Sequence, residues 1–594
     1  MKLTYFPCDE RYKKPVGGVR VNEEVTVFAF ASGEAQAVFF VLTKEKETPV
    51  WYEMRRADGE RFTLSLRVTS EGLYFYRFVV RCSGTDTAFY ADSELNAREG
   101  KGDEWQLTVY DEVYAAPSFL DGGIIYQIFP DRFNIGGERL KTKPGAVYRD
   151  DTYGTPYYKA DEKGIVPNND FFGGNLDGVT EKLDYLKSLG VKCVYLNPIF
   201  EAASNHKYDT GSYRRIDGDF GGEAAFRRLI SAANEKGVKI ILDGVFSHTG
   251  DDSVYFNRYG HYDSVGAFQS DGSPYKSWYR FDDKGGYECW WGVKILPCTE
   301  ETDPSFNEFI NGEDGIVRSY MRMGIAGWRL DVADELPDVF LDNLTRAVKK
   351  INPEGIVLGE VWEDASNKVA YSLRRRYLLG KQLDSVTNYP FKDAIIRFAR
   401  LGDGANLKRT VDSIVNNYPP RVLRNLMNPL STHDTVRALV AVSGEELPGT
   451  KNERAEFRLR DTETAKKRLR LAAALQYTLP GVPCLYYGDE AGAEGCEDPF
   501  NRRFYPWNNA DEELVGFFRE LGRLRARSEL NGGGIRFIRA CDGLVEFTRG
   551  EGLRVLANAT EIAVPLGEAV TDLVTGNETR VAAPLSAVVW EERK

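Results

Sequence analysis

Short apolar segments follow one another through the first 120 residues of the chain. They are rich in β-branched and aromatic residues, show no helical period, and are separated by turns of Gly, Asp, Glu and Lys; examples are residues 25–30, 37–42, 62–67 and 73–80. Regularly spaced short strands of this kind are typical of a β-sandwich. We therefore expect residues 1–120 to form an N-terminal β-sandwich.

From residue 121 the pattern changes to short apolar runs that alternate with amphipathic helical periods. Candidate strands cover residues 124–129, 191–196, 238–243, 327–332, 356–361, 426–430 and 483–487, with a fainter eighth at 382–386. Strands that alternate with helices indicate a parallel sheet, and eight such units predict a (β/α)8 barrel. The predicted fold class is therefore α/β, with a barrel over residues 121–510.

Two other regions depart from the barrel pattern. An irregular stretch at about residues 249–300, rich in Tyr, Trp, Gly and Asp, follows the third strand, and we expect it to form a subdomain inserted at the barrel mouth. Residues 511–594 begin with a helical period, and apolar runs at 544–548 and 553–557 come after it. This pattern predicts a helix and a small C-terminal β domain.

Charge and composition exclude several classes of partner. The 594 residues include 77 Lys and Arg against 89 Asp and Glu, a formal net charge of −12, which disfavours a nucleic-acid partner. No apolar run approaches the ~18–20 residues that cross a bilayer, so no membrane partner is expected. The start of the chain shows no signal peptide, and the eight cysteines are scattered without a CxxC pair. We expect a cytoplasmic location, although a secreted mature form would begin in the same way.

Four predicted strands each end in a carboxylate. The third ends at Asp243, the fourth at Asp331, the fifth at Glu360 and the seventh at Asp434. Reacting groups of a (β/α)8 barrel lie at the C-terminal ends of its strands. A single buried acid is usually a satisfied structural group, but four at equivalent positions would be costly to bury without a function. The pattern indicates an active site built from acids.

The histidines point to the same place. The chain has only four, and His206, His248 and His433 lie at strand ends or in the loops that follow, each near an acid in sequence. His261 lies in the irregular insert, where we expect an exposed loop residue.

These segments resemble a known family. Residues 243–248 (DGVFSH), 327–331 (GWRLD), 359–362 (GEVW) and 433–434 (HD) are similar to the four signature regions of the α-amylase family, glycoside hydrolase family 13. The N-terminal region resembles the starch-binding-type domain that precedes the barrel in cyclomaltodextrinases, maltogenic amylases and neopullulanases.

The resemblance implies a role for each site residue. Asp331 would be the nucleophile and Glu360 the general acid/base of a retaining glycosidase, with Asp434 as a third acid that grips sugar hydroxyls. The implied substrate-binding residues are Arg329, His248, His433, Tyr208, Asp243, His206, Trp362, Asp498 and Arg502. Aromatic residues of the insert fit stacking on sugar faces: Trp278, Tyr287, Trp290 and Trp291.

Departures from the family pattern bear on metal binding. Ser247 stands where relatives commonly have an Asn that helps to hold calcium, and residues 134–140 (NIGGERL) lack the usual acidic run. Hard cations need several oxygen ligands. We therefore expect no required cofactor, with Asn134, Gly174 and Asn175 as the candidates for a single calcium ion. A further departure is Asp334, where the cyclodextrin-degrading subgroup usually has Asn.

The implied function is hydrolysis of α-1,4-glucosidic bonds in maltodextrins, starch, pullulan or cyclodextrins through a covalent glycosyl-Asp intermediate. An α-glucan transglycosylase or a sucrose isomerase would use the same acids and stays an alternative. A non-catalytic glucan-binding protein is disfavoured because all three acids are present. The expected partner is an α-glucan oligosaccharide or polysaccharide, and a homodimer stays open. We expect the N-terminal sandwich and the insert to wall the barrel mouth.

Overall fold

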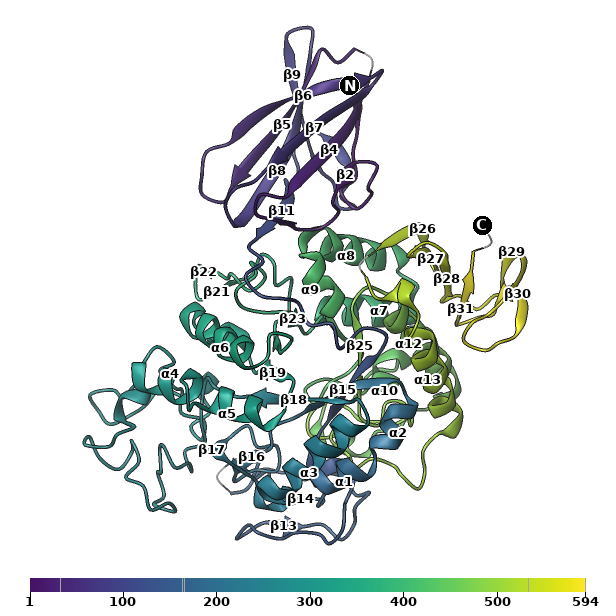
Figure 1. Cartoon of the computed structure of the whole chain (residues 1–594). Coiled ribbons are helices and arrows are strands. Elements are labelled where there is room, and N and C mark those ends of the chain that lie inside the picture. The colour runs from purple at the N-terminus through teal and green to yellow at the C-terminus, as the bar shows by residue number, and fades with distance from the viewer. Residues whose placement is uncertain (33, 163, 165, 533, 593–594) are drawn as a thin grey trace.

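The computed structural model describes residues 1–32, 34–162, 164, 166–532 and 534–592 (Figure 1). The N-terminal strands form two layers. Strand β6 joins the layers, because it pairs with β5 on one side and with β7 on the other. Between the layers lies a buried core that includes Val27, Phe40, Phe78 and Trp105. The strands are β1 (Leu3–Thr4), β2 (Lys13–Lys14), β3 (Val19–Arg20), β4 (Glu24–Ala31), β5 (Ala37–Lys44), β6 (Val50–Asp58), β7 (Arg61–Arg67), β8 (Gly72–Cys82), β9 (Thr85–Ala91), β10 (Ala97–Glu99) and β11 (Trp105–Tyr110).

An eight-stranded parallel sheet forms the barrel. Its order is β23-β20-β19-β18-β15-β12-β25-β24, and a parallel bridge between Thr387 and Met427 brings the two edges together. The predicted α/β barrel is confirmed, and the fainter eighth strand is reduced to two residues. The strands are β12 (Ile124–Ile128), β15 (Val191–Leu196), β18 (Lys239–Gly244), β19 (Gly327–Leu330), β20 (Ile356–Gly359), β23 (Ser385–Val386), β24 (Met427–Pro429) and β25 (Val482–Tyr486).

Helices cover the outside of the barrel, and most of them bury one face, whereas the second half of α12 is buried all round. In α3, for example, Ala225, Phe226, Leu229, Ile230 and Ala233 are buried at the spacing of a single helix face. The helices are α1 (Leu176–Glu181), α2 (Leu183–Ser188), α3 (Gly222–Glu235), α4 (Pro304–Asn311), α5 (Ile316–Met323), α6 (Asp338–Ile351), α7 (Tyr389–Leu401), α8 (Gly404–Asn417), α9 (Pro420–Asn425), α10 (Ala438–Ser443), α11 (Lys451–Glu456), α12 (Thr462–Thr478) and α13 (Glu512–Arg525). Within the described residues, no helix is both long enough and apolar enough to span a bilayer.

The insert after β18 has little regular structure and is held together by packed rings. Phe256 and Tyr279 pack edge to face with ring centroids 4.9 Å apart, and Trp278 packs on Phe306 of α4 at 5.2 Å. His261 is exposed and pairs with Asp252, as expected for a loop residue. Short strand pairs occur in the loops after β12, β15 and β20: β13 (Val147–Tyr148) with β14 (Asp170–Phe171), β16 (Phe200–Ala202) with β17 (Thr210–Ile216), and β21 (Val369–Ala370) with β22 (Leu373–Arg374).

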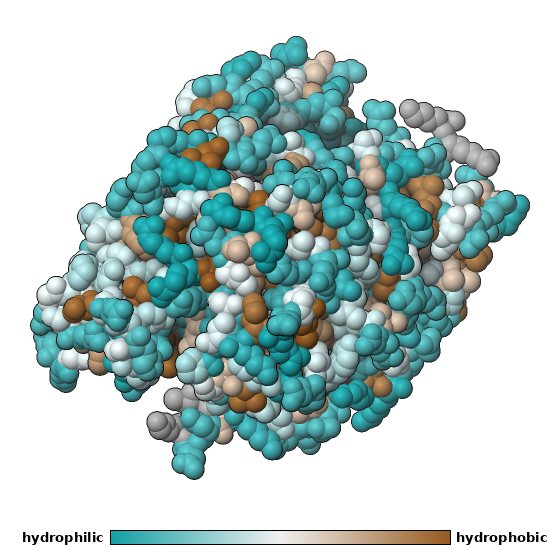
Figure 2. Space-filling model, turned by 60° about the horizontal axis from the view of Figure 1, so that its bottom comes forward, coloured by the Kyte–Doolittle hydropathy of each residue, from teal (hydrophilic) through white to brown (hydrophobic). Residues whose placement is uncertain are grey.

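After α13 the chain forms the predicted C-terminal β strands. Two buried arginines attach α13 and these strands to the barrel: Arg525 of α13 donates to the carbonyl of Gly481 at 2.7 Å, and Arg549 of the strand region donates to that of Thr478. The surface in Figure 2 is mostly hydrophilic, with hydrophobic residues in small patches. The strands are β26 (Ile535–Cys541), β27 (Leu544–Arg549), β28 (Leu553–Asn558), β29 (Val564–Thr571), β30 (Glu578–Ala582) and β31 (Ser586–Glu591).

Gly327 sets the close approach of β19 and β20. It has φ 153°, and a Cβ at this position would lie 2.0 Å from the carbonyl oxygen of Ile356. Any side chain would therefore push the two strands apart. We expect Gly327→Ala to destabilise the fold by about 1–3 kcal/mol, as overpacking in a core does, and to lower the melting temperature.

Gly516→Ala is the matched control in a melting scan. Gly516 lies in α13, and a Cβ there meets nothing within 4 Å. Because Ala is the better helix former by about 0.5–1 kcal/mol, this variant should melt at the wild-type temperature or above. Equal melting of the two variants would contradict the packing argument.

Candidate active site

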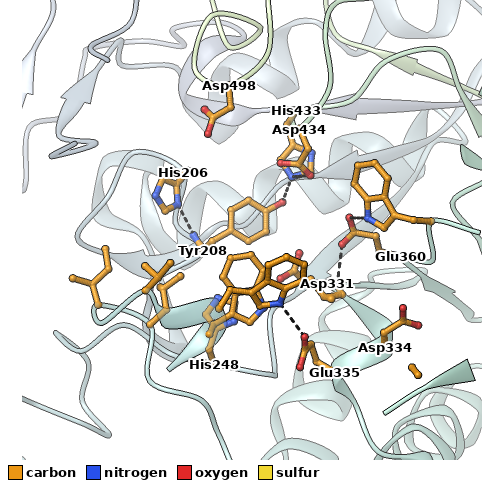
Figure 3. Close-up of a pocket in the computed structure, with 18 of the residues that line it drawn as sticks. His206, Tyr208, His248, Asp331, Asp334, Glu335, Glu360, His433, Asp434 and Asp498 are labelled. Atoms are coloured by element: carbon orange, nitrogen blue, oxygen red, sulfur yellow. Dashed lines mark hydrogen bonds and ion pairs between the residues drawn. The ribbon is translucent and has the colours of Figure 1, made fainter. Parts of the chain in front are cut away.

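A cavity of about 840 Å³ opens at the C-terminal ends of the barrel strands (Figure 3). Ten of the twelve residues expected at the site line it: His206, Tyr208, His248, Asp331, Glu360, Trp362, His433, Asp434, Asp498 and Arg502. The other two, Asp243 and Arg329, are buried and contact Tyr208, Asp331 and Glu360 from beneath the cavity. The structure therefore brings together residues that are as far as 296 positions apart, from His206 to Arg502.

Strand register places Asp331 beside Glu360. Leu330 of β19 pairs with Gly359 of β20, and the two acids are the residues that directly follow this pair. Neighbouring strands lie ~4.8 Å apart, so the two side chains start from adjacent backbone positions at the same edge of the sheet. This is the proximity that two cooperating carboxyl groups need.

One buried guanidinium contacts three carboxylates. Nη1 of Arg329 lies 2.7 Å from Asp331 Oδ1 and 2.8 Å from Asp243 Oδ1, and Nη2 lies 2.7 Å from Glu360 Oε2. Burial opposes the charge of Arg329, but Asp243 and Glu360 hold its pKa above the ordinary value. The arginine therefore stays charged and offsets part of the repulsion among the acids.

The two adjacent acids form a coupled pair. Burial raises the pKa of Asp331, the charge of Glu360 raises it further, and Arg329 opposes both effects. Glu360 accepts from the backbone N–H of Val332 at 2.9 Å and from Trp362 Nε1 at 3.1 Å. The charge of the Glu360 carboxylate therefore opposes ionisation of Asp331, and Arg329 offsets part of that effect.

His433 and Tyr208 form one side of the cavity. Gln127 Nε2 donates to His433 Nδ1 at 2.9 Å, so the ring proton resides on Nε2, which lies 3.1 Å from Asp434 Oδ2. Burial lowers the pKa of His433 well below its ordinary value, and the ring stays neutral. Tyr208 stacks on this ring with centroids 5.3 Å apart and donates to Asp243 Oδ2 at 2.9 Å.

Asp434 lies between the cavity and a basic residue. About a third of its side chain is exposed, and Arg502 Nη2 is 3.3 Å from its Oδ1. Desolvation by the surrounding protein and the charge of Glu360 raise the pKa of Asp434 to about 7, against the opposing effect of Arg502. Arg502 also pairs with Asp498 at 2.9 Å.

His248 has an unused hydrogen-bonding atom at the cavity. Its Nδ1 lies 3.1 Å from Ser247 Oγ, whereas its buried Nε2 has no partner among the described residues. Burial lowers the pKa of His248 to about 4, so the ring is neutral at pH 7. An orphaned buried nitrogen costs free energy unless a bound molecule contacts it. His248 is therefore ready to bind a hydroxyl group.

Sequence reasoning missed residues that support the site from behind. Gln127 orients His433, Tyr195 donates to Asp243 Oδ2 at 2.6 Å, and Tyr389 stacks on Trp362 with centroids 3.9 Å apart. Gln127 and Tyr195 could have been found from the sequence, because each places a polar group in the mainly apolar run of a barrel strand, β12 or β15. The contact of Tyr389 follows only from the tertiary structure.

The aromatic insert contributes to the cavity in part. Trp290 and Trp291 line it, whereas Trp278 and Tyr287 pack inside the insert. Among the described residues, those that line the cavity begin at Asn168. The expectation that the N-terminal sandwich walls the mouth is therefore wrong for this chain, because that domain packs behind the barrel loops instead.

The calcium candidates are engaged in local hydrogen bonds. Asn175 caps α1, and its Oδ1 accepts from the N–H groups of Gly178 at 2.7 Å and Gly136 at 3.1 Å. Asn134 Nδ2 donates to the Gly178 carbonyl, and Gly174 N–H donates to the Asp131 carbonyl. Within the described part of the chain, no group of three or more His, Cys, Asp and Glu is arranged to hold a metal.

Known proteins share this chain's sequence and fold. The family model "Alpha amylase, catalytic domain" matches residues 127–307 and 296–530. The neopullulanase 2 of Thermoactinomyces vulgaris is 32% identical, over 85% of this chain and 82% of that protein. The chain belongs to the alpha-amylase family. The matched region includes the ends of β18, β19 and β20, where Asp243, Asp331 and Glu360 lie.

Other relatives of this alpha-amylase family member are longer. The amylopullulanase of Thermoanaerobacterium saccharolyticum is 35% identical over 89% of this chain but only 45% of that protein, so the chain spans less than half of its length. The solved type III pullulan hydrolase of Thermococcus kodakarensis superposes with a TM-score of 0.68 at 26% identity, over the whole of both chains.

The raised pKa of Asp434 predicts a pH effect on stability. The folded protein holds this proton up to about pH 7, whereas an unfolded chain releases it near the ordinary value of 3.8. The proton therefore stabilises the fold at low pH, and this contribution is lost as the pH rises from about 4 to about 7. The melting temperature of the wild type minus that of Asp434→Asn should fall across this window and then level off. The change should be only about one or two degrees, because the side chain is partly solvated. A difference that rises with pH would show that the pKa is lowered instead.

Proposed function

We propose that this alpha-amylase family protein is a retaining glycoside hydrolase that cleaves α-1,4-glucosidic bonds in maltodextrins, starch, pullulan or cyclodextrins. The observation that carries the proposal is that Asp331 and Glu360 both form ion pairs with the guanidinium of Arg329 at the floor of an open cavity. The names of the relatives, amylopullulanase and neopullulanase, support an α-glucan as substrate.

The first step breaks the glycosidic bond. Glu360 donates a proton to the leaving oxygen while the Asp331 carboxylate bonds to C1, and the leaving saccharide departs with its hydroxyl group restored. Glu360 is left negative, and the donors that already contact it, Val332 N–H and Trp362 Nε1–H, stabilise that charge.

The second step reverses the roles. Glu360 removes a proton from a water molecule, the water oxygen bonds to C1, and the Asp331 carboxylate leaves. A sugar hydroxyl in place of water gives transglycosylation with the same groups. Product analysis on maltohexaose, β-cyclodextrin, pullulan and soluble starch therefore measures both outcomes, since transfer yields products longer than the substrate.

The neighbouring polar groups suit a sugar ring in the cleaved position. His248 Nε2 has no hydrogen-bond partner among the described residues, and His433 and Tyr208 both line the cavity, with His433 Nε2 hydrogen-bonded to the Tyr208 hydroxyl beside Asp434. Arg502 and Asp498, which form an ion pair further along the cavity, suit the hydroxyls of the next glucose. The positive charge that develops on the ring is stabilised by Asp331 and Asp434.

We expect Asp331→Asn and Glu360→Gln each to lower kcat on maltohexaose by about 10⁴-fold or more while the circular dichroism spectrum is kept. Asp331→Asn loses the bond-forming oxygen. Glu360→Gln loses the acid, and it should regain part of its activity on a glycosyl fluoride, whose leaving group needs no proton. Reducing-sugar release measures the activity of the wild type and of both variants. Near-wild-type hydrolysis by either variant would overturn the proposed roles.

We also propose that activity needs no calcium, because the amide oxygen of Asn175 is already occupied by two backbone N–H groups. Dialysis against a chelator should leave the melting temperature within about 1 °C and kcat within about 10% of the values for the untreated protein. Magnesium and calcium are then added back separately. A loss that calcium alone restores would contradict this proposal.

A further inference from the structure

The chain between β20 and β23 forms the wall of the cavity next to Glu360. It runs outward from the end of β20, turns in the β21–β22 hairpin, and returns at residue 384. In Figure 3, Glu360, Asp334 and Glu335 lie on the opposite side of Asp331 from His206 and Asp498. The side next to the proton donor is where a leaving saccharide sits in the proposed mechanism. The lining residues of this wall are Trp362, Glu363, Lys368, Val369, Ala370 and Tyr371.

The inner face of the wall is attached close to the proposed nucleophile. Lys368 Nζ lies 3.0 Å from Asp334 Oδ2, and the Tyr377 hydroxyl donates to Asp334 Oδ1 at 2.7 Å. Asp334 follows Asp331 by three residues. The acid that departs from the subgroup pattern therefore serves as the anchor of a lysine in the wall.

The outer face of the wall is attached to the N-terminal domain. Gln106 of β11 is buried, its Nε2 donates to Ser366 Oγ at 2.8 Å, and its Oε1 accepts from Asn367 Nδ2 at 2.9 Å. Asn367 and Lys368 are neighbours in the chain, so one turns to the N-terminal domain and the next to the cavity. Only one peptide bond separates the two attachments.

A second contact holds the hairpin itself. Arg374 of β22 contacts both carboxylate oxygens of Glu45: its Nη2 lies 2.7 Å from Oε1, and its Nε lies 3.0 Å from Oε1 and 3.2 Å from Oε2. Both side chains are only about a quarter exposed, at 27% and 25%. Arg374 is the strand partner of Val369, which lines the cavity. Forked, partly buried pairs fix geometry better than single surface pairs do.

Through these contacts the N-terminal domain holds the wall of the cavity, although the described part of the domain does not itself touch the cavity. Its described residues do not line the cavity, yet Gln106 and Glu45 each hold a residue adjacent to, or paired with, one that does. Lys381 adds a third link, to Glu71 at 2.7 Å, on the return of the same segment.

We propose that Gln106 and Glu45 are positioning residues that set the leaving-group wall of the cleft, so that binding of the glucose units beyond the scissile bond depends on the N-terminal domain of the same chain. This inference rests on the proposed hydrolase function. It predicts an effect confined to substrates that carry several glucose units on the leaving side.

The test compares two substrates in Glu45→Gln, Gln106→Ala and the double variant. Maltohexaose reaches along the wall, whereas the aglycone of 4-nitrophenyl α-maltoside is a single small ring. We expect KM for maltohexaose to rise about 3- to 10-fold with kcat changed less than about two-fold, and the constants for the nitrophenyl substrate to stay at the wild-type values. The exchanged pair Glu45→Arg with Arg374→Glu should recover most of the wild-type KM.

Glu104→Gln is the matched control, because Glu104 pairs with Arg77 inside the N-terminal domain at a similar exposure of 25% and 21%. It should leave the constants for both substrates unchanged. Wild-type KM for maltohexaose in the double variant would overturn the inference, as would a parallel loss on both substrates with a lower melting temperature, which marks a purely structural role. A wild-type protein inactive on both substrates would instead overturn the proposed function on which the inference rests.

Discussion

The contact of one buried guanidinium with three carboxylates is the constraint on which the site depends. Arg329 is inaccessible to water, and so are most of the atoms of Asp243, Asp331 and Glu360. Without the cation, two or three like charges would be buried in a medium of low polarity, and each would destabilise the fold by several kcal/mol. With it, the acids stay close enough to act together. The parallel register of β18, β19 and β20 makes this contact possible, because it brings residues from three strands to one edge of the sheet.

A set of neutral hydrogen-bonding groups surrounds this charged centre. Burial keeps His248 and His433 uncharged, so neither adds a positive charge that would compete with Arg329 for the acids. His433 receives its orientation from Gln127, and Asp243 accepts from Tyr195 and Tyr208. His248 Nε2, which has no partner among the described residues, lies at the cavity, and such a neutral group suits a ligand rich in hydroxyl groups and poor in charge.

The domains outside the barrel act on this centre through its loops. The insert after β18 brings Trp290 and Trp291 to the cavity, and the segment after β20 forms a further wall that the N-terminal domain contacts. A barrel provides rigid strand ends, and the shape of the cleft then depends on how its long loops are held. Contacts such as that of Gln106 with Asn367 show how a separate domain limits the conformations of such a loop.

The sequence by itself determined the alternation of strands and helices, the β texture at both ends and the acids at the strand ends, because periodicity and residue type are local properties. Ten of the twelve expected residues line the cavity, and Asp243 and Arg329 support them from below. Only the tertiary structure decided the rest. That Gln127 orients His433, that Tyr389 stacks on Trp362, and that the N-terminal domain lies behind the cleft rather than across its mouth are contacts between distant segments. They depend on how side chains pack in three dimensions, and no spacing along the chain encodes such packing.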